Sequence, residues 1–339
     1  MADICATKDK KFMKAVWFEK FGPAREVLIL GEKATPVPQA NEVLIKIKTS
    51  AVNPSDVKKR NGSFPNMLDE SDCIPHSDGS GDIVAVGADV SKSRIGQRVW
   101  VYQAQFARMF GSCAEYLAID TRRAVLLPDE ASYEEGACLG IPAMTAHRCV
   151  FSDKGVKGQN VLITGGAGRV GFYAIQWAKF SGATVIATAS NEEDKAACLA
   201  VGADHVVNHR SETWVDDILE ITGEAKIQRA IDVEFGENLP SVLKMMSVNG
   251  VIATYSSTQV PEPKLPFFQM MYLDLTIRLV IVYAMPEAAK VAAIEDISAA
   301  LTAGRLQHRI AKVYPVAEVV ASHEDIESGQ VRGCVLVTI

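Results

Sequence analysis

The sequence lacks the features that mark several broad classes of protein. Its longest apolar run, Leu279 to Met285, is far shorter than the roughly 18 residues of a membrane-spanning helix. The first residues carry charge where a signal peptide needs an apolar segment. The seven cysteines are scattered and form no C-x-x-C pair, which excludes a recognisable zinc knuckle, thioredoxin motif or secreted disulfide framework. We therefore expect a cytoplasmic protein with reduced thiols.

The sequence also lacks an excess of positive charge. Lysine and arginine total 35 against 41 aspartate and glutamate, a formal net charge of −6. Such a chain has no electrostatic footprint for nucleic acid or for an anionic membrane. Hydrophobic residues make up 48% and charged residues 22%, a globular balance, and the 339 residues predict two domains.

The first part of the chain has the pattern of a β-rich domain. We expect residues 1–12 to form a polar extension. Short apolar segments separated by glycine and proline then continue to about residue 125. The clearest strand candidates are Glu42–Lys48, Asp82–Val86, Arg98–Tyr102 and Ala114–Ile119. Two further strand candidates, Lys312–Val316 and Cys334–Ile339, follow a helix near the end of the sequence.

From Tyr133 onward the pattern changes to helices alternating with bare apolar runs. Tyr133 to Val150 has helical spacing broken at Pro142. The runs expected as buried parallel strands are Asn160–Thr164, Thr184–Thr188, His205–Asn208, Arg229–Val233, Gly250–Tyr255 and Leu279–Tyr283. Helical segments are expected at 170–180, with Gly182 just past the helix end, and around 192–201, 212–222 and 238–247. This alternation predicts an α/β, doubly wound parallel sheet.

The strongest chemical signal is a glycine cluster between the first of these strands and the first helix. Gly165, Gly168 and Gly171 form a G-x-x-G-x-x-G string that follows a strand and opens a helix. Glycines let the backbone approach a pyrophosphate, and the helix N-terminus supplies N–H groups and a partial positive charge. The alternative is a tight strand–helix turn without a ligand.

The cofactor type follows from the end of the second strand. NAD sites place an acidic residue there, about 20 residues after the glycines, to hold the ribose 2′-hydroxyl. Counting on from Gly171 reaches Ala189 and Ser190 with no acid at the strand end, and the small Ser190 hydroxyl leaves room for a 2′-phosphate that His209 and Arg210 could face. This favours NADPH, although Glu192 and Glu193 lie close by, and the 209–210 segment could simply be a solvated loop.

Five strings occur in order: AVNPSD (51–56), GSCAEYLA (111–118), LGIPAMTAHR (139–148), GGAGRVG (165–171) and VVNHR (206–210). Together they resemble the zinc-free, zeta-crystallin-like quinone oxidoreductase branch of the medium-chain dehydrogenase/reductase superfamily. The resemblance implies a GroES-like β-rich catalytic domain, 1–139 plus 286–339, interrupted by a Rossmann NADP(H)-binding domain at 140–285. It also implies an active site in the cleft between the domains and a homodimer or homotetramer.

Zinc-dependent members of this superfamily hold their catalytic metal at positions that match Asn53, Ser77 and Ile141 here. These side chains offer almost nothing to a zinc ion, so we expect no metal. His76 lies one residue from the usual histidine and is expected on a turn surface, with a shifted ligand as the alternative. Hydride transfer to an already electrophilic acceptor needs no Lewis acid.

The resemblance carries further site residues. Asn53 matches an asparagine near the nicotinamide and substrate. Lys58 replaces a tyrosine over the cofactor and is either a proton donor, an acid-binding group or a solvent-facing lysine. Cofactor-binding residues are expected at Thr145, Ala167, Gly168, Arg169, Val170, Ser190, His209, Arg210, Asn238, Tyr255, Ser256, Ser257, Thr258, Ile281, Val282 and Tyr283. Arg169 replaces a glycine and either contacts phosphate or points to solvent.

A longer and more apolar loop than usual, Tyr102 to Gly111, places Phe106, Met109 and Phe110 either in the substrate pocket or in the core. The function implied is NADPH-dependent, zinc-independent reduction of a small-molecule quinone. The alternatives are reduction of an enone, enal or enoyl-thioester, which needs a proton donor, and a non-catalytic NADPH-binding role. No nucleic acid or membrane partner is expected.

Overall fold

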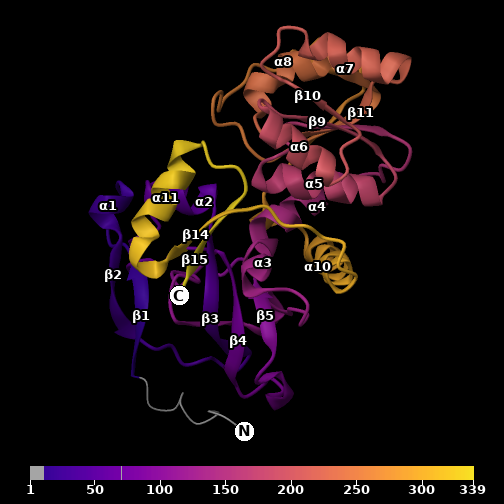
Figure 1. The fold of residues 1–339 in the computed structure, drawn as a ribbon. Coiled ribbons are helices and arrows are strands. Elements are labelled where there is room, and N and C mark those ends of the chain that lie inside the picture. Colours follow the sequence, from indigo (N-terminus) through magenta and orange to yellow (C-terminus); the bar gives the residue numbers. More distant parts are fainter. Residues whose placement is uncertain (1–10, 70) are drawn as a thin grey trace. The chain divides into compact units, whose positions relative to one another are not determined.

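The protein is described by a computed structural model covering residues 11–69 and 71–339 (Figure 1). Residues 1–10 of the expected polar extension lie outside the described residues, and Phe12 already begins a strand. The chain forms two compact units. Unit 1 holds the described residues up to Ile141 together with Ile294–Arg305 and Ile310–Ile339, and unit 2 holds Pro142–Ala293 with Leu306–Arg309.

Unit 1 is built on a largely antiparallel seven-stranded sheet in the order β14-β15-β3-β4-β5-β7, with β6 also paired to β3. Its strands are β3 (Glu42–Val52), β4 (Asp78–Val86), β5 (Arg98–Val101), β6 (Tyr116–Asp120), β7 (Ala124–Leu126), β14 (Ile310–Pro315) and β15 (Cys334–Thr338). The last strand, β15, pairs antiparallel with β3 and parallel with β14. A separate two-stranded sheet joins β1 (Phe12–Trp17) and β2 (Ile29–Ala34).

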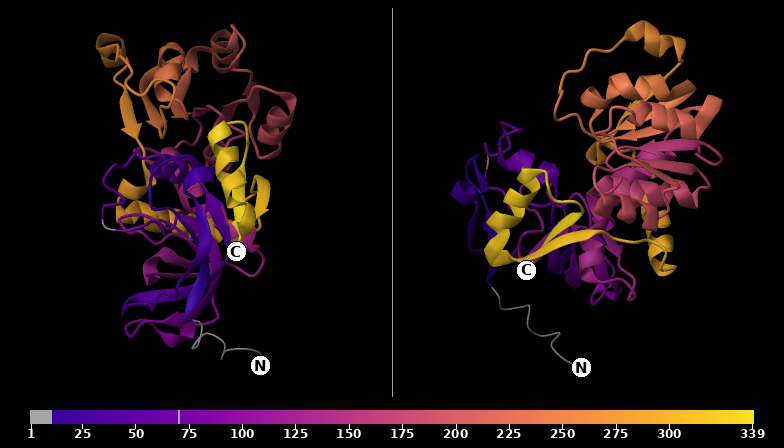
Figure 2. Two further views of the ribbon diagram at one scale, coloured as in Figure 1. Left: turned by 90° about the vertical axis from the view of Figure 1, so that its left-hand side faces the viewer. Right: turned by 45° about the horizontal axis from the view of Figure 1, so that its top comes forward.

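The central strand of unit 1, β3, is buried on both faces. Val43, Ile45 and Ile47 belong to one hydrophobic cluster, while Leu44 belongs to another that includes residues of the C-terminal helix α11. This follows the two-residue period of a strand. The helices of the unit are α1 (Ala24–Val27), α2 (Pro54–Arg60), α3 (Tyr133–Ala137) and α11 (Val319–Ser328), and α11 lies against α2 and α1 (Figure 2).

Unit 2 contains the expected parallel sheet. Its six strands run in the order β10-β9-β8-β11-β12-β13, and every pairing is parallel. They are β8 (Asn160–Ile163), β9 (Thr184–Thr188), β10 (His205–Val207), β11 (Ile227–Asp232), β12 (Met246–Thr254) and β13 (Thr276–Leu279). The strand order reverses between β8 and β11, and such a switch point is where open α/β sheets bind ligands.

The helices of unit 2 are α4 (Met144–Phe151), α5 (Arg169–Phe180), α6 (Glu192–Ala200), α7 (Trp214–Thr222), α8 (Phe235–Met245) and α9 (Phe267–Tyr272), and α10 (Glu287–Thr302) is divided between the units. The expected end of α5 is confirmed, because Gly182 follows the cap with φ +78°. Among the described residues no helix is long and apolar enough to cross a membrane.

The prediction of a strand at Leu279–Tyr283 is wrong. The ladder with β12 covers Thr276–Leu279 and stops where β12 itself ends, with Thr254 opposite Leu279. Val282–Ala284 form a short 3-10 turn instead. The apolar run 279–283 is therefore a strand end followed by a turn that is only partly buried.

Candidate functional site

The predicted cofactor residues of unit 2 cluster at the edge of the sheet where the parallel strands end. Their order along the chain follows the strands: the glycine turn after β8, Ser190 after β9, His209 and Arg210 after β10, and the remaining groups after β11, β12 and β13. Because the carboxyl ends of parallel strands share one edge, these loops are neighbours. Thr145 instead lies on α4, where it is buried.

The glycine turn is held by the strand beside it. Gly165 has φ +62°, and its N–H donates to Thr188 Oγ1 at 3.0 Å, while the N–H of Gly166 donates to the Thr188 carbonyl at 3.0 Å. The N-cap of α5 is Gly168, which brings no side chain to cap the first turn. A Cβ on Gly171 would lie 2.3 Å from the Gly165 carbonyl oxygen.

This turn fits a pyrophosphate. The Gly165 carbonyl oxygen lies too close to Gly171 for any side chain at that position. At the start of α5, N–H groups that no side chain caps are available to a ligand. Arg169, at the first position of α5, is half-buried. The residues at the turn therefore suit the phosphates of a dinucleotide.

Polar contacts join the end of β8 to the end of β11, and the start of α8 to Asp232 and to the loop after β12. Thr164 Oγ1 donates to Asp232 Oδ1 at 2.6 Å, and Asn238 Nδ2 donates to the same oxygen at 2.7 Å. Burial raises the pKa of Asp232. Ser257 Oγ accepts from the Gly236 N–H at 2.9 Å. The amide of Asn238 is thus oriented by a buried carboxyl group.

At the far end of the sheet edge, the residues expected near the adenosine ribose differ in exposure. Ser190 is half-buried, whereas His209 and Arg210 are exposed in the turn after β10. In the loops after β12 and β13, Tyr255, Ser256 and Ser257 are half-buried, Thr258 and Ile281 are exposed, and Val282 and Tyr283 are buried.

In unit 1 the predicted residue Asn53 is 2% exposed, directly after β3. It caps α2, whose first position is Pro54, as expected for an Asn–Pro helix start. The Asn53 N–H donates to Asp56 Oδ2 at 2.8 Å, and its Nδ2 donates to Asp78 Oδ2 at 2.8 Å. The Ile141 N–H donates to the same oxygen of Asp78 at 2.8 Å. Asn53 is therefore rigidly positioned.

Both carboxyl groups of this cluster are shifted by burial. Burial raises the pKa of Asp78 to about 8 and that of Asp56 to about 6. Both donors to Asp78 reach Oδ2, while Oδ1 is buried without a hydrogen-bond partner in the structure. The proton of Asp78 at neutral pH belongs on Oδ1, packed against Gly140, where a Cβ would lie 2.0 Å away.

We expect Asp78→Asn to flatten the pH dependence of stability. In the unfolded chain Asp78 ionises near pH 4, whereas in the fold it stays protonated up to about pH 8, so stability falls as the pH rises between those values. Through this one group, the free energy of unfolding is about 3–5 kcal/mol lower at pH 8 than at pH 4. Asparagine keeps both hydrogen bonds and stays neutral. Thermal melting from pH 5 to 8 measures the difference, with Asp89→Asn at an exposed turn as control. Parallel melting profiles for wild type and Asp78→Asn would contradict it.

The residues at the positions of the family's zinc ligands do not fit a zinc ion. Asn53 turns its amide donor to Asp78, and Ile141 offers only an alkyl chain. The ammonium of the buried Lys59 lies 3.4 Å from Ser77 Oγ and donates to the Gln105 carbonyl at 2.6 Å. A lysine side chain beside the Ser77 hydroxyl, next to an amide donor and an alkyl chain at the other two positions, is the opposite of the ligand set that a divalent metal needs.

The prediction that His76 lies on a turn surface is wrong. His76 is fully buried with φ +78°, and its Nδ1 is 2.8 Å from Ser50 Oγ. Its Nε2 is 2.9 Å from Nε2 of His323, on α11. Burial lowers the pKa of His76 to about 3 and also lowers that of His323. Both imidazoles are therefore neutral parts of the core of unit 1.

Of the two adjacent lysines on α2, Lys58 is exposed and Lys59 is buried. The apolar loop that follows β5 is ordered: the Met109 carbonyl accepts from the Ile74 N–H at 2.8 Å, and Met109 packs beside a small buried cluster. Phe106 is half-buried and Phe110 is 51% exposed.

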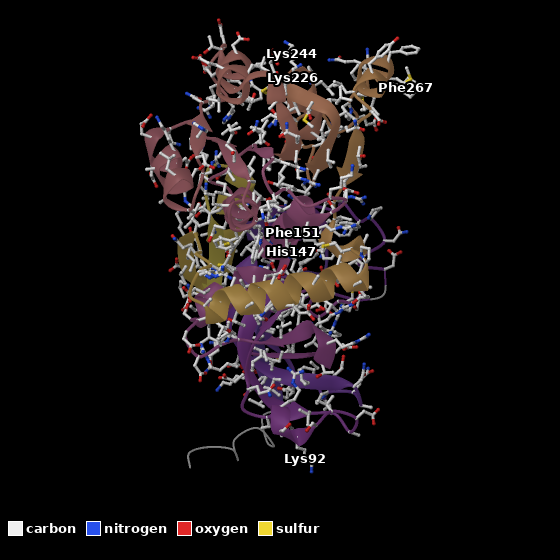
Figure 3. The ribbon with its side chains drawn as sticks, turned by 90° about the vertical axis from the view of Figure 1, so that its right-hand side faces the viewer. Lys92, His147, Phe151, Lys226, Lys244 and Phe267 are labelled. Atoms are coloured by element: carbon white, nitrogen blue, oxygen red, sulfur yellow. The ribbon has the colours of Figure 1, made fainter. Side chains whose placement is uncertain are left out.

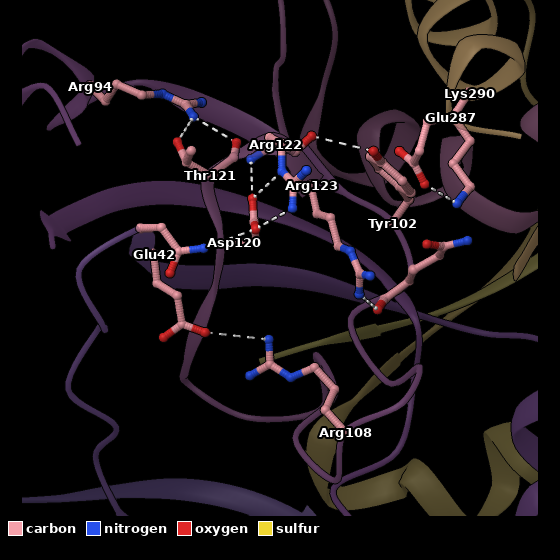
Figure 4. A network of polar contacts seen from close by, with 12 residues as sticks. Glu42, Arg94, Tyr102, Arg108, Asp120, Thr121, Arg122, Arg123, Glu287 and Lys290 are labelled. Carbon is pink, nitrogen blue, oxygen red and sulfur yellow. Dashed lines mark hydrogen bonds and ion pairs between the residues drawn. The ribbon is translucent and has the colours of Figure 1, made fainter. Parts of the chain in front are cut away.

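Two arginines tie this loop to the strand β6 and to the short turn that follows it (Figure 4). Arg108, within the loop, donates to the Ala118 carbonyl at 2.6 Å and lies 4.0 Å from Glu42. Arg123 donates to the Gln103 carbonyl at 3.2 Å. The loop thus holds its aromatic side chains on a fixed backbone.

Comparisons with known proteins cover both units. Residues 39–129 match the family model of the alcohol dehydrogenase GroES-like domain, and residues 170–299 match that of the zinc-binding dehydrogenases. The quinone oxidoreductase of Sus scrofa is 32% identical over 320 residues, 94% of each chain, and that of Homo sapiens is 30% identical over 325 residues, 94% of this chain and 95% of the other. The solved quinone oxidoreductase from Coxiella burnetii superposes with a TM-score of 0.82 at 26% identity, covering 97% of this chain and 100% of that one.

Proposed function

Because the chain belongs to the zinc-free quinone oxidoreductase branch of the medium-chain dehydrogenase/reductase superfamily, we propose that this oxidoreductase reduces a quinone or similar electron-poor acceptor with NADPH. The observation that carries the proposal is the glycine turn before α5, whose backbone leaves no room for a side chain at Gly171. NADPH, when bound, supplies the hydride. The protein's task is to bind and orient the reactants and to exclude water.

The residues divide this task along the sheet edge. Ala167, Gly168, Arg169 and Val170 would hold the pyrophosphate through backbone N–H groups. Ser190, His209 and Arg210 would bind the 2′-phosphate. The nicotinamide end would be positioned by Thr145, Asn238, Tyr255, Ser256, Ser257, Thr258, Ile281, Val282 and Tyr283.

We assign Asn53 to orient the reacting groups in unit 1, since its amide is buried and fixed by Asp78. The carboxyl proton of Asp78 is packed against Gly140, which makes it a poor donor to a substrate. Lys58 is exposed, and Phe106, Met109 and Phe110 would form the acceptor's apolar surroundings. A quinone suits this arrangement because it accepts hydride without a dedicated acid.

The test is NADPH oxidation by metal-stripped protein with a naphthoquinone and a simple 2-enone assayed in parallel. We expect turnover with the quinone, unchanged by a chelator. Faster turnover of the enone would move the assignment to alkene reduction and direct attention to Lys58 as proton donor. NADPH binding without turnover of either acceptor would favour a non-catalytic role.

We also propose that the chain forms a homodimer or homotetramer. Strand β13 pairs with β12 on one side, and in the described part of the chain no strand pairs with its other edge. Helix α9 nearby in the sequence exposes Phe267 (67%), Phe268 (70%) and Tyr272 (79%), of which Phe267 is labelled in Figure 3. Open strand edges and large apolar patches are usually covered. Light scattering or sedimentation equilibrium measures the mass.

A further inference from the structure

After α10 the chain passes briefly back into unit 2 before it enters β14. Residues Leu306–Arg309 belong to unit 2 although they follow α10. Gln176 on α5 clamps them twice: its Oε1 accepts from the Gln307 N–H at 2.8 Å, and its Nε2 donates to the Gln307 carbonyl at 3.0 Å. Tyr173, one turn earlier, places its hydroxyl 2.7 Å from His308 Nδ1. The segment is thereby held rigidly along α5.

These contacts place the guanidinium of Arg309 beside the glycine turn. Arg309 Nη1 donates to the Ala167 carbonyl at 3.1 Å, and Nη2 lies 2.8 Å from Asp194 Oδ1. Glu193 Oε1 is 3.6 Å from the same nitrogen. The Arg309 side chain is 16% exposed and that of Asp194 only 5%. One arginine therefore links the expected pyrophosphate loop to the first turn of α6.

Both carboxylate oxygens of Asp194 have a donor in this arrangement. Its Oδ2 accepts from Asn191 Nδ2 at 2.8 Å, while Oδ1 faces Arg309. The Asp194 N–H donates back to Asn191 Oδ1 at 2.8 Å, which caps α6. Asp194 thus lies in the first turn of α6, six residues after the last residue of β9, and each of its oxygens already has a donor.

The position of Asp194 gives the ion pair a consequence for the cofactor. In NAD sites an acidic side chain just after this strand accepts the ribose 2′-hydroxyl and repels a 2′-phosphate. A carboxylate paired with a guanidinium is less suited to either role, because each oxygen already has a donor and its charge is balanced. Here the buried acid is Asp194, and the positive charge of Arg309 offsets its negative charge.

We propose that Arg309 is the specificity-determining residue for the 2′-phosphate of NADPH: it withdraws the Asp194 carboxylate from the adenosine ribose and cancels its charge. This rests on the proposed cofactor. Arg309 acts through Asp194 and the glycine turn. Because the contacts with α5 already fix the segment that carries Arg309, binding the cofactor costs little further conformational entropy there.

The test compares dissociation constants of NADPH and NADH for the full-length wild type and Arg309→Met by titration calorimetry. We expect at least about a tenfold weaker binding of NADPH, because an unpaired carboxylate then faces the 2′-phosphate, with NADH unchanged or tighter. The fragments 2′,5′-ADP and 5′-AMP should repeat the difference. Equal weakening of both dinucleotides, or no change in their ratio, would overturn the proposal.

Two variants separate specificity from structural damage. Arg309→Met combined with Asp194→Asn should recover most of the NADPH affinity and lose any gain for NADH, since no carboxylate is left to unmask. Lys179→Met removes the same charge near the other end of α5, where Lys179 pairs with Asp204 at 2.5 Å, and should leave the ratio unchanged. A double variant no better than Arg309→Met would contradict the role of Asp194.

The outcomes also separate this proposal from the proposed function. Wild type that binds NADPH and discriminates against NADH, yet reduces no quinone, would reject quinone reduction while leaving the role of Arg309 intact. A quinone reductase whose cofactor preference ignores Arg309→Met would reject the role of Arg309 alone. Wild type that binds neither dinucleotide would reject both.

Discussion

Gly171→Ala is expected to weaken NADPH binding by more than about a hundredfold, since several charge-assisted phosphate contacts depend on one backbone arrangement. The new Cβ would lie 2.3 Å from the Gly165 carbonyl oxygen and 2.9 Å from the Gly166 Cα. Both are backbone atoms, so the clash is relieved only by opening the turn and moving the start of α5. Overpacking of this kind also costs about 1–3 kcal/mol of stability. Titration calorimetry and thermal melting measure the two effects separately.

A matched control exists in the same unit. Gly155, in the segment before β8, has open space around the position of a Cβ, with no heavy atom within 4 Å. Gly155→Ala adds the same methyl group and should leave NADPH affinity and melting temperature near those of wild type. Wild-type NADPH affinity in Gly171→Ala would show that the glycine turn does not hold the phosphates.

Arg60→Met should destabilise unit 1 by about 3–5 kcal/mol, the range seen when one partner of a buried ion pair is removed. The Arg60 side chain is fully buried and pairs with Glu327 on α11. It also donates to the Gly22 carbonyl and reaches His323 Nδ1 at 3.4 Å. Methionine fills similar space but leaves these acceptors without a donor. Chemical denaturation measures the loss.

The control uses a second arginine that pairs with the same helix. Arg25 binds Glu324 at 2.7 Å, about one turn before Glu327, but its side chain is 72% exposed. Arg25→Met should lower the free energy of unfolding far less than Arg60→Met does, because water solvates both partners of an exposed pair. Equal losses from Arg60→Met and Arg25→Met would contradict the weight given to burial.

The features that local sequence determines were predictable. The glycine turn, α5 and Gly182 are set by residues within one β-α unit, and the parallel order of the sheet follows from alternating strands and helices. The misplaced strand at 279–283 shows the limit of reading apolar runs, because the partner strand decides where a ladder ends.

Long-range contacts were out of reach. His76 is buried by a histidine 247 residues away, and no pattern near residue 76 announces that partner. The lysines of KKR look alike in sequence, yet the phase of α2, set by its start at Pro54, exposes Lys58 and buries Lys59. Arg309 contacts the glycine turn only because its segment returns to α5.

A row of buried hydrogen bonds runs from Arg60 through the two histidines to Ser50, and the direction of donation along it is fixed. Arg60 only donates, so His323 accepts at Nδ1 and donates from Nε2 to His76, which then donates from Nδ1 to Ser50. The row continues through Ser112, 2.7 Å from Ser50, to the backbone carbonyl of Asp78 at 2.6 Å. A guanidinium, which can only donate, begins this row, and a peptide oxygen, which can only accept, ends it. Each imidazole is therefore held in a single neutral tautomer, with the ring proton on Nε2 in His323 and on Nδ1 in His76.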